Sequence, residues 1–263
     1  MTRPVITLTS DFGQADGYVA AMKGVILSLC PEAVIVDISH EIQPQAVRQA
    51  AYVLSTAAPY FPAGAVHLAV VDPGVGSARP SIAVQTERAF YVAPDNGVLD
   101  FALARDPAQR AVHLTDVEFQ RPEASSTFHG RDIFAPAAAH LARGVAIHEM
   151  GQPVDPTTLV RRPARQPERL PDGSWQGEIL HADHFGNLIT DIQHPPEPSE
   201  RVFIQVGGTR IVGVGHTFAD VEPGELVAYV GSNGHLEIAV REGDATARLG
   251  LGVGDPITVG TSP

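Results

Sequence analysis

Two patterns of apolar and polar positions alternate along the first half of the chain. Short, mainly apolar runs predict strands at residues 5–9, 34–38, 67–71, 82–85 and 90–92. Apolar residues three or four positions apart predict helices between or after them, at residues 18–29, 45–58, 98–104 and 133–142. Pro31 ends the first helix, and Gly144 can cap the last one. This succession predicts an α/β domain with a central sheet flanked by helices.

The composition and the pattern of apolar positions change in the second half of the chain. Residues 152–173 are rich in Pro, Arg and polar side chains and lose periodicity, which is typical of a linker. Short alternating runs follow, separated by the hairpin signals Gly207-Gly208 and Asn233-Gly234. We therefore predict an α/β domain at 1–160, a linker at 161–172 and a small all-β, barrel-like domain at 173–263.

Composition narrows the class of partner. The net charge is −12 with only 18 Lys and Arg residues, which argues against nucleic-acid binding and suits a small cationic substrate better. Cys30 is the sole cysteine, so intrachain disulfides and cysteine zinc sites are excluded. The N-terminus does not resemble a secretion signal, and no apolar run is long enough for a membrane span. A soluble cytoplasmic protein is expected.

Carboxylates follow the predicted strands at places where ligands bind in α/β sheets. Asp11 comes directly after the first strand, where its carboxylate could hold both hydroxyls of a ribose. The alternative is that Asp11 or Asp16 only caps the next helix, and for Asp16 capping is favoured.

A second candidate segment runs from Asp72 to Arg79, after the apolar strand at 67–71. Gly74 and Gly76 would let the backbone approach a ligand, but the spacing does not match a phosphate-binding loop. Taken alone, Asp-Pro-Gly is more typical of a turn. His129 lies just before the last helix of the first domain, where an incidental histidine at a helix entry is the simpler interpretation.

In the second domain the candidates are Asp183, Asn187, Phe218, Tyr229 and Ser232. On pattern alone, Phe218 is typical of a core residue. A metal site at His129, His181, Asp183 and His184 is not expected, because His181 and His184 would face opposite sides of a presumed strand. Serine hydrolysis is not expected either, because no Gly-x-Ser-x-Gly elbow occurs.

Considered together, the motifs have a specific order. TSDFG, the D-G-Y after it, VDPGVGSAR, APDNG, FHGRDIFAP, DHFGN and SNGHLEIAV resemble the S-adenosylmethionine (SAM) hydroxide adenosyltransferases over nearly the whole chain. These enzymes, also called SAM hydrolases, are related to fluorinating and chlorinating adenosyltransferases. The resemblance implies a homotrimer of two-domain subunits with SAM bound between neighbouring subunits. It also implies adenosine and methionine as products, with no cofactor and no metal.

The resemblance implies a role for each candidate residue. Asp72, Arg79 and His129 match the catalytic trio that handles water. The implied substrate-binding residues are Asp11 for the ribose hydroxyls, Asp16 and Asp183 for the methionine part, Asn187 for the adenine edge, Phe218 for stacking on the base, and Tyr18, Tyr229 and Ser232 for the remaining wall, the last two from a partner subunit.

The resemblance also separates this chain from its halide-using relatives. In the fluorinating enzymes Tyr stands at the position of Asp72, and a halide-contacting Ser stands at that of Gly130. Two further positions depart from the family pattern: Gln45 replaces an aromatic residue over the ribose, and Gly243-Asp244-Ala245 replaces Gly-Asn-Ala.

The implied reaction sets a limit on the mechanism. A sulfonium leaves as neutral methionine, so no acid is needed, and fixing the water in line accounts for roughly 7–11 kcal/mol of the barrier. Full proton transfer from water (pKa ~15.7) to a free Asp (~3.9) costs about 16 kcal/mol, so preformed hydroxide is not expected. We infer that Arg79 orients and that Asp72 or neutral His129 accepts the proton late.

Two other functions remain open at this point. The chain could transfer the adenosyl group to chloride, or it could be a non-catalytic sensor of adenosine or SAM.

Overall fold

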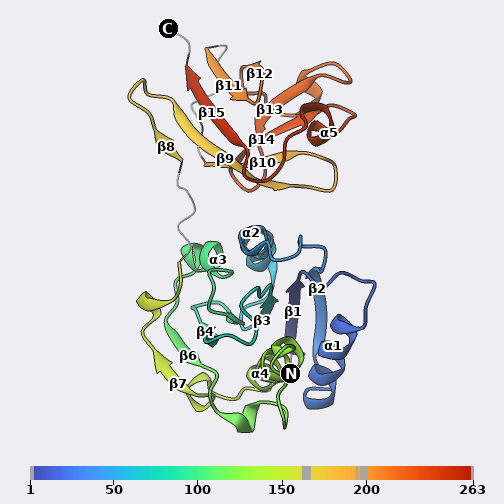
Figure 1. Ribbon diagram of the computed structural model, residues 1–263, viewed down its shortest axis with the longest axis vertical. Helices are drawn as coiled ribbons and strands as arrows, with labels where there is room; N and C mark the ends of the chain where they lie inside the picture. Colours follow the sequence, from blue (N-terminus) through green and yellow to red (C-terminus); the bar gives the residue numbers. More distant parts are fainter. Residues whose placement is uncertain (1–2, 162–166, 194, 196–200, 262–263) are drawn as a thin grey trace. The chain divides into compact units, whose positions relative to one another are not determined.

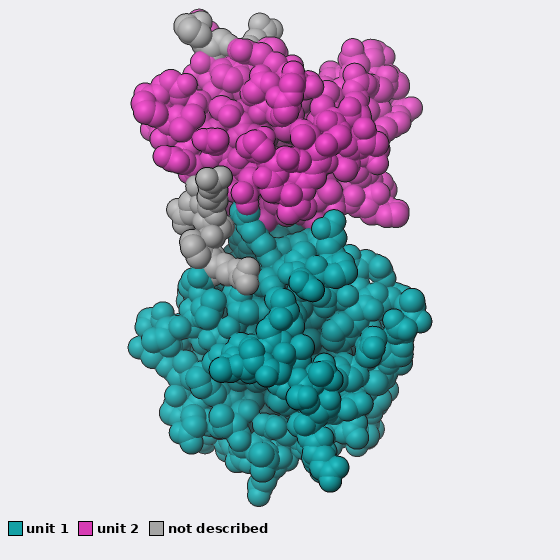
Figure 2. Space-filling model, viewed as in Figure 1, with its two compact units in different colours: residues 1–162 teal, residues 163–263 magenta. Residues whose placement is uncertain are grey.

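The computed structural model describes residues 3–161, 167–193, 195 and 201–261. Figure 2 colours the two units into which the chain divides, Met1–Arg162 and Pro163–Pro263. Within the described ranges, no helix is long and apolar enough to cross a membrane.

The first unit is built on a seven-stranded mixed sheet in the order β2-β1-β3-β5-β4-β6-β7 (Figure 1). Strands β2, β1, β3 and β5 are parallel, and β4, β6 and β7 continue the sheet in antiparallel pairs. The strands are β1 (Val5–Ser10), β2 (Val34–Ser39), β3 (Val66–Val70), β4 (Ser81–Gln85), β5 (Phe90–Pro94), β6 (Arg110–His113) and β7 (Gln152–Val154).

Helices cover both faces of this sheet. They are α1 (Tyr18–Leu29), α2 (Val47–Ala57), α3 (Asp100–Arg105) and α4 (Ala135–Ala142). Shorter turns of helix lie at η1 (Ala58–Tyr60), η2 (Val117–Phe119), the π-helical η3 (Gly130–Phe134), η4 (Ile147–Glu149) and η5 (Pro156–Thr158).

The alternation of side chains along β3 shows how two cores arise from one strand. Leu68 and Val70 join the core beneath α1 and α4, whereas Ala69 and the following Val71 join the core beneath α2 and α3. Successive residues of a strand point to opposite faces, so a continuous apolar run is needed where both faces are covered.

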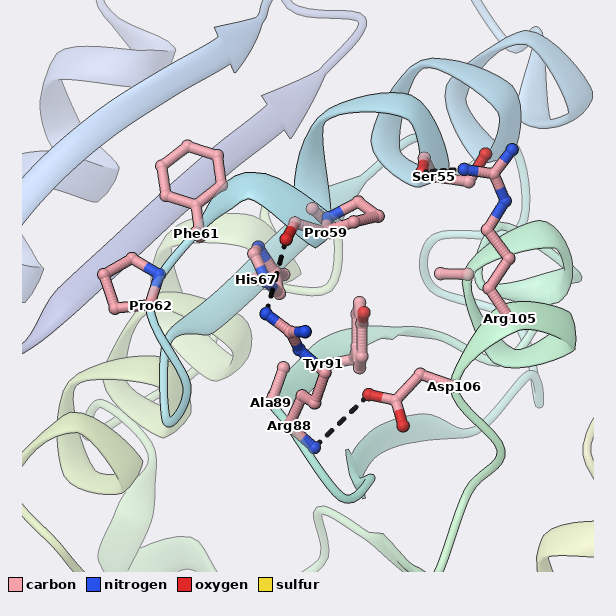
Figure 3. A pocket seen from close by; sticks show the side chains of 12 residues that line it. Ser55, Pro59, Phe61, Pro62, His67, Arg88, Ala89, Tyr91, Arg105 and Asp106 are labelled. Carbon is pink, nitrogen blue, oxygen red and sulfur yellow. Dashed lines mark hydrogen bonds between the residues drawn. The ribbon is translucent and has the colours of Figure 1, made fainter. Parts of the chain in front are cut away.

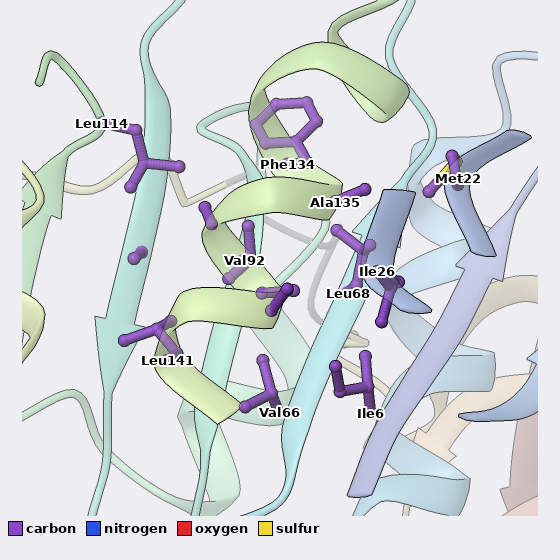
Figure 4. Packing of buried hydrophobic residues seen from close by; sticks show 14 of the residues in the cluster. Ile6, Met22, Ile26, Val66, Leu68, Val92, Leu114, Phe134, Ala135 and Leu141 are labelled. Atoms are coloured by element: carbon purple, nitrogen blue, oxygen red, sulfur yellow. The ribbon is translucent and has the colours of Figure 1, made fainter. Parts of the chain in front are cut away.

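Phe134 is the largest side chain that is fully buried in the first of these cores. Figure 4 shows it at the start of α4, with Leu68 of β3 and Met22 and Ile26 of α1 in the same cluster. Removing such a ring from water stabilises the fold by roughly 1.5–3 kcal/mol. The π-helical turn that precedes α4 is thereby anchored to the core.

The second unit is a sheet of eight strands in the order β12-β11-β15-β9-β10-β14-β13, with β8 paired to β9. An isolated bridge between Gly215 and Tyr229 nearly closes it into a barrel, whose interior is apolar. Its elements are β8 (Glu168–Arg169), β9 (Trp175–Ala182), β10 (Leu188–Gln193), β11 (Val202–Val206), β12 (Thr209–Val212), η6 (Phe218–Asp220), β13 (Leu226–Val230), β14 (His235–Val240), α5 (Ala245–Leu249) and β15 (Pro256–Thr261).

The predicted fold class, an α/β domain followed by a barrel-like β domain, is confirmed. The hairpins predicted at Gly207-Gly208 and Asn233-Gly234 are also present, between β11 and β12 and between β13 and β14. Each of these two glycine-containing turns joins adjacent antiparallel strands, which is typical of such sequences.

One local prediction was wrong, and one strand was missed. Residues 152–154 form the edge strand β7 instead of a linker, and the four-residue strand β6 was not predicted. Pro153 obscured β7, because proline is tolerated in a sheet at an edge strand but not inside it. Of the predicted linker at 161–172, residues 162–166 lie outside the described residues, and Glu168–Arg169 pairs with β9.

Candidate active site

Asp72, Arg79 and His129 form one hydrogen-bonded group in the first unit. Arg79 Nε donates to both carboxylate oxygens of Asp72, at 2.9 and 3.0 Å, and its Nη2 also pairs with Oδ2. The same Nη2 lies 2.8 Å from His129 Nδ1. The side chains of Asp72 and Arg79 are 5% and 9% exposed, so water screens this ion pair little.

The turn that follows β3 brings these groups together. Backbone bonds from Val75 N to Asp72 O and from Ser77 N to Gly74 O close it. Gly76 has a φ of 77°, and a Cβ there would lie 2.7 Å from the carbonyl oxygen of Ser126. The turn thus needs glycine at this position, and it packs against the segment that leads to His129.

Every nitrogen of the Arg79 guanidinium group makes a hydrogen bond. Besides the bonds to Asp72 and His129, Nη1 donates to Ser81 Oγ at 2.7 Å. Its guanidinium carbon lies 5.2 Å from the centroid of the Phe134 ring, the residue that anchors the α1 and α4 core. The guanidinium is therefore a rigid support and not a mobile charge.

The contact with Arg79 determines the protonation of His129. A guanidinium nitrogen can only donate, so Nδ1 of His129 must accept, and the neutral ring carries its proton on Nε2. Burial lowers the pKa of His129, and the positive charge of Arg79 lowers it further, against opposing effects of Asp72 and Asp132. His129 is therefore a neutral donor at pH 7.

A cavity of about 430 Å³ opens beside this group. Asp11, Tyr18, Asp72 and His129 all contribute to its lining. They come from the loops after β1 and β3, the start of α1 and the start of η3, so the structure brings together four of the side chains singled out from the sequence. Parallel strands place such loops at the same edge of the sheet.

Aromatic rings form one wall of the cavity. Phe12, Tyr18 and Phe128 pack with centroid separations of 5.8, 5.9 and 5.3 Å, and Tyr18 is 50% exposed. Phe12 and Phe128 were not predicted as site residues. Phe12 directly follows Asp11 in the sequence, and Phe128 directly precedes His129. Their position next to candidate residues was the available signal.

Asp11 has a partner that the sequence did not indicate. Its Oδ2 accepts the backbone N–H of Gln45 at 2.8 Å, and Gln45 holds a φ of 68°, which non-glycine residues rarely adopt. Asp11 and Gln45 both line the cavity, and this hydrogen bond holds each of them in place.

The capping role considered for Asp11 and favoured for Asp16 was wrong, because α1 has Gly17 at its N-cap and no side-chain cap. Asp16 is exposed and does not line the cavity.

Ser10, His40 and Asp37 lie in a row just behind the Asp11 loop. Ser10 Oγ is 2.7 Å from His40 Nδ1, and His40 Nε2 is 3.1 Å from Asp37 Oδ1. Ser10 is 1% exposed and does not line the cavity, so it cannot meet a substrate as a nucleophile. Since Gly13 N also donates to His40 O, this row supports the loop that carries Asp11.

In the second unit, Asp183 and Asn187 form the tight turn between β9 and β10. Asp183 accepts the backbone N–H groups of Phe185 and Asn187, each at 2.9 Å, and the side-chain amide of Asn187 at 2.8 Å. Three bonds thus occupy the carboxylate. Asn187 is 7% exposed, its backbone carbonyl accepts from Asp183 N at 3.0 Å, and its side-chain oxygen Oδ1 has no hydrogen bond among the described residues.

Phe218 and Tyr229 form a second group there, with ring centroids 4.8 Å apart. Phe218 is 41% exposed, so its interpretation as a core residue was wrong. Tyr229 donates its hydroxyl proton to Glu237 Oε2 at 2.7 Å. Ser232 is exposed in the turn between β13 and β14.

Glu237 is a residue that the sequence prediction missed. Burial raises its pKa, and the negative charge of Asp183 acts in the same direction, against the hydrogen bond from Tyr229. A Cβ at Gly231 would overlap its carboxylate. Glu237 therefore links the Asp183 turn to Tyr229, although its place in an alternating strand gave no indication of this.

Among the described residues, no group of His, Cys, Asp and Glu side chains has the arrangement of a metal site. The prediction that His181 and His184 face opposite sides of one strand was wrong. His184 lies in the turn after β9 and not in the strand, so strand alternation does not separate it from His181.

Comparison with known proteins identifies relatives along nearly the whole chain. The model of the SAM hydroxide adenosyltransferase N-terminal domain matches residues 6–151, and that of the C-terminal domain matches residues 177–258. A protein of Thermus thermophilus named (R)-S-adenosyl-L-methionine hydrolase is 47% identical over 97% of this chain and 98% of its own. One of the same name from Salinispora tropica is 45% identical over 97% of both chains.

Similarity extends to solved structures and to a related activity. The crystal structure of a conserved protein from Thermotoga maritima superposes with a TM-score of 0.88 at 36% identity, covering 97% of this chain and 99% of the other. A fluorinase of an Actinoplanes species is 28% identical over 97% of both chains.

The coupling of Arg79 and His129 can be tested by an NMR pH titration of the histidine rings. His129 should titrate below the ordinary value of 6.5, and the Arg79→Met variant should raise its pKa, because the variant removes a positive charge next to Nδ1. His140, whose pKa is lowered mainly by burial, is the matched control and should not move. A His129 pKa that is the same in both proteins would contradict the pairing.

Proposed function

The chain belongs to the SAM hydroxide adenosyltransferase family, and we propose that it hydrolyses SAM to adenosine and methionine through attack of water at the ribose C5′ carbon. The observation that carries this proposal is the group of Asp72, Arg79 and His129 at the rim of an open cavity. Curated relatives named SAM hydrolase, up to 47% identical, support the same substrate.

The reaction places few demands on acid–base chemistry. A new C5′–O bond forms while the C5′–S bond breaks, and the electron pair of that bond leaves on sulfur to give neutral methionine. No acid has to protonate the leaving group. The main requirement is a water molecule held in line with the breaking bond, which accounts for roughly 7–11 kcal/mol of the barrier.

His129 and Asp72 can hold such a water from two sides. His129 donates from Nε2 to one lone pair of the water, which leaves the other lone pair to attack carbon. Among the described residues, Asp72 Oδ1 accepts from Arg79 Nε alone, so it has a further lone pair for a proton of the water. We assign Asp72 as the acceptor of the proton, because the ring nitrogen of His129 that faces away from Arg79 already carries one.

The proton moves late in this mechanism. Making free hydroxide beforehand with an ordinary Asp would cost about 16 kcal/mol, from the pKa values of water and Asp. As the C5′–O bond forms, the water oxygen becomes positive and its protons become acidic. Transfer to Asp72 at that stage is favourable without a strongly basic carboxylate.

The space around Gly130 favours water over halide. A side chain at this position would meet Met22 Sδ at 3.2 Å, and the rings of Phe128 and Phe12 at 3.3 and 3.4 Å. The position therefore neither carries a hydroxyl for a halide nor has room for one without local movement. Asp72 adds a negative charge, which disfavours an anion nearby.

The remaining candidate residues would form the two halves of a substrate site, one half in each unit. Asp11, held by Gln45, would bind the ribose hydroxyls from the first unit. In the second unit the side-chain oxygen Oδ1 of Asn187 would accept from the adenine amino group, and the exposed ring of Phe218 would stack on the base. Glu237 positions Tyr229 through the hydrogen bond from its hydroxyl.

We further propose that these halves come from neighbouring copies in a homotrimer. Each half presents exposed aromatic surface, with Tyr18 at 50% and Phe218 at 41%. A ligand held between copies would cover both surfaces. The negative net charge of −12 suits a substrate that carries a sulfonium and an ammonium group.

Isotope labelling tests the proposed reaction. With SAM in ¹⁸O-water the products should be adenosine, labelled at the 5′-hydroxyl, and unlabelled methionine. Asp72→Asn should lower kcat by about 10²- to 10⁴-fold, because it removes the proton acceptor, and should change KM only a few-fold.

Three outcomes would contradict the proposed reaction, and a fourth would contradict the role of Asp72. Label in an amino-acid product would exclude attack at C5′, and chloroadenosine formed with chloride would identify a halide transferase. Bound but unchanged SAM would identify a sensor. Undiminished hydrolysis by Asp72→Asn would remove Asp72 from its role.

Mixing of inactive variants tests the arrangement between subunits. Co-expression of Asp72→Asn with the double variant Asn187→Ala/Phe218→Ala should restore about a quarter of the sites, because each site takes its halves from two different copies. The matched control pairs Asp72→Asn with Asp11→Asn, both in the first unit, and should restore none. Equal activity in the two mixtures would place the whole site within one chain.

A further inference from the structure

A second cavity, of about 290 Å³, lies in the first unit beneath α2 and α3 (Figure 3). Its lining comes from the end of α2, the loop before β3, the starts of β3 and β5, and the end of α3. None of these residues lines the cavity next to Asp72. The two cavities are separate places in the unit.

Strand direction puts the second cavity at the opposite edge of the sheet. His67 and Tyr91 are the second residues of β3 and β5, which run parallel and pair at these two positions. Asp72 follows the far end of β3. The second cavity thus lies at the amino ends of the strands, and the candidate active site lies at their carboxyl ends.

The floor of the cavity includes the hydroxyl of Tyr91. Tyr91 is 3% exposed as a whole residue and lines the cavity, and its hydroxyl makes no hydrogen bond with any described residue. Burial raises the pKa of Tyr91 to about 12, so the hydroxyl keeps its proton. A protonated hydroxyl that lines a cavity can donate a hydrogen bond to an acceptor bound there.

His67 provides a second neutral group beside it. The ring is 1% exposed, and its Nδ1 lies 2.8 Å from Thr7 Oγ1. Burial lowers the pKa of His67 to about 4, so the ring is uncharged at pH 7. The floor therefore favours a polar but uncharged group.

The walls are apolar and flat. The ring of His67 lies 5.0 Å from that of Tyr91 at an interplanar angle of 32°, and 5.7 Å from that of Phe61. Small apolar side chains complete the lining, namely Ala58, Pro62, Ala89 and Ala102. A planar ring fits such walls better than a branched or charged body.

Two exposed arginines lie at the mouth, and neither forms an ion pair with a described residue. Within the described part of the chain their guanidinium groups donate to backbone oxygens, Arg88 to that of Pro59 at 3.4 Å and Arg105 to that of Ser55 at 3.3 Å. The nearby carboxylate of Asp106 instead accepts from the Thr86 hydroxyl at 2.5 Å. The mouth therefore carries two positive charges and one negative charge. It is positive although the net charge of the chain is −12.

We propose that this cavity binds a flat aromatic monocarboxylate that carries a polar group at the end remote from the carboxylate. The carboxylate pairs with Arg88 and Arg105, the ring lies against His67 and Phe61, and the remote group hydrogen-bonds to the Tyr91 hydroxyl. Guanidinium forks match the geometry of a carboxylate.

Calorimetry with 4-hydroxybenzoate on the full-length protein tests the site. The probe should bind more tightly than benzoate, which lacks the remote group, and more tightly than 4-hydroxybenzamide, which lacks the charge. Tyr91→Phe should weaken 4-hydroxybenzoate about two- to tenfold, as expected for one neutral hydrogen bond, and leave benzoate unchanged. Arg88→Gln/Arg105→Gln should weaken both acids about tenfold or more and leave 4-hydroxybenzamide unchanged.

Two controls make a negative result decisive. Hydrolysis of SAM by Tyr91→Phe at the wild-type rate would show that the variant is folded. Binding of 4-hydroxybenzoate by Asp72→Asn with unchanged affinity would separate this site from the first cavity. The proposal is overturned if 4-hydroxybenzoate does not bind, or if its affinity is the same in wild type, Tyr91→Phe and the double arginine variant.

Discussion

The guanidinium of Arg79 is the group on which the candidate active site depends, because it only donates hydrogen bonds and has an acceptor on each side. Asp72 accepts with both oxygens and His129 with Nδ1. This arrangement gives the two neighbours different roles: the histidine becomes a neutral donor, and the carboxylate remains the acceptor. Ser81 and the ring of Phe134 hold the guanidinium itself in place. Arg79 is thus a positioning residue, and its effect on chemistry passes through the groups that it orients.

The fold supplies the rest of this geometry through strand direction. β1 and β3 are parallel neighbours, so Asp11 and Asp72 emerge at the same edge of the sheet. His129 reaches that edge from the π-helical turn before α4, which Phe134 ties to the buried core. The opposite edge of the same strands carries a cavity with a neutral floor and a positive mouth. One sheet therefore carries two cavities with chemically different linings, one at each end of its parallel strands.

Much of this arrangement could be predicted from the sequence, and the remainder depends on contacts that a linear pattern does not contain. Asp11 and Asp72 could be placed because each follows an apolar strand, whereas His129, far along the chain, could be joined to them only by family resemblance. The positive φ of Gln45 arises from a tertiary bond to Asp11, so no local signal announces it. Phe12 and Phe128 have the pattern of core residues, and Glu237 that of the polar side of a strand. Pro153 concealed β7, because only the finished sheet shows that this strand lies at an edge.

In the proposed mechanism, Arg79 sets the protonation of His129, and a single water is held between His129 and Asp72. Neutron diffraction from deuterium-exchanged crystals with bound adenosine and methionine would locate the protons that this mechanism requires. Deuterium is expected on Nε2 of His129 and not on Nδ1. The 5′-hydroxyl of adenosine, whose oxygen comes from the attacking water, should accept from Nε2 and donate to Asp72. Deuterium on Nδ1, or a protonated Asp72 facing that hydroxyl, would rule out this mechanism.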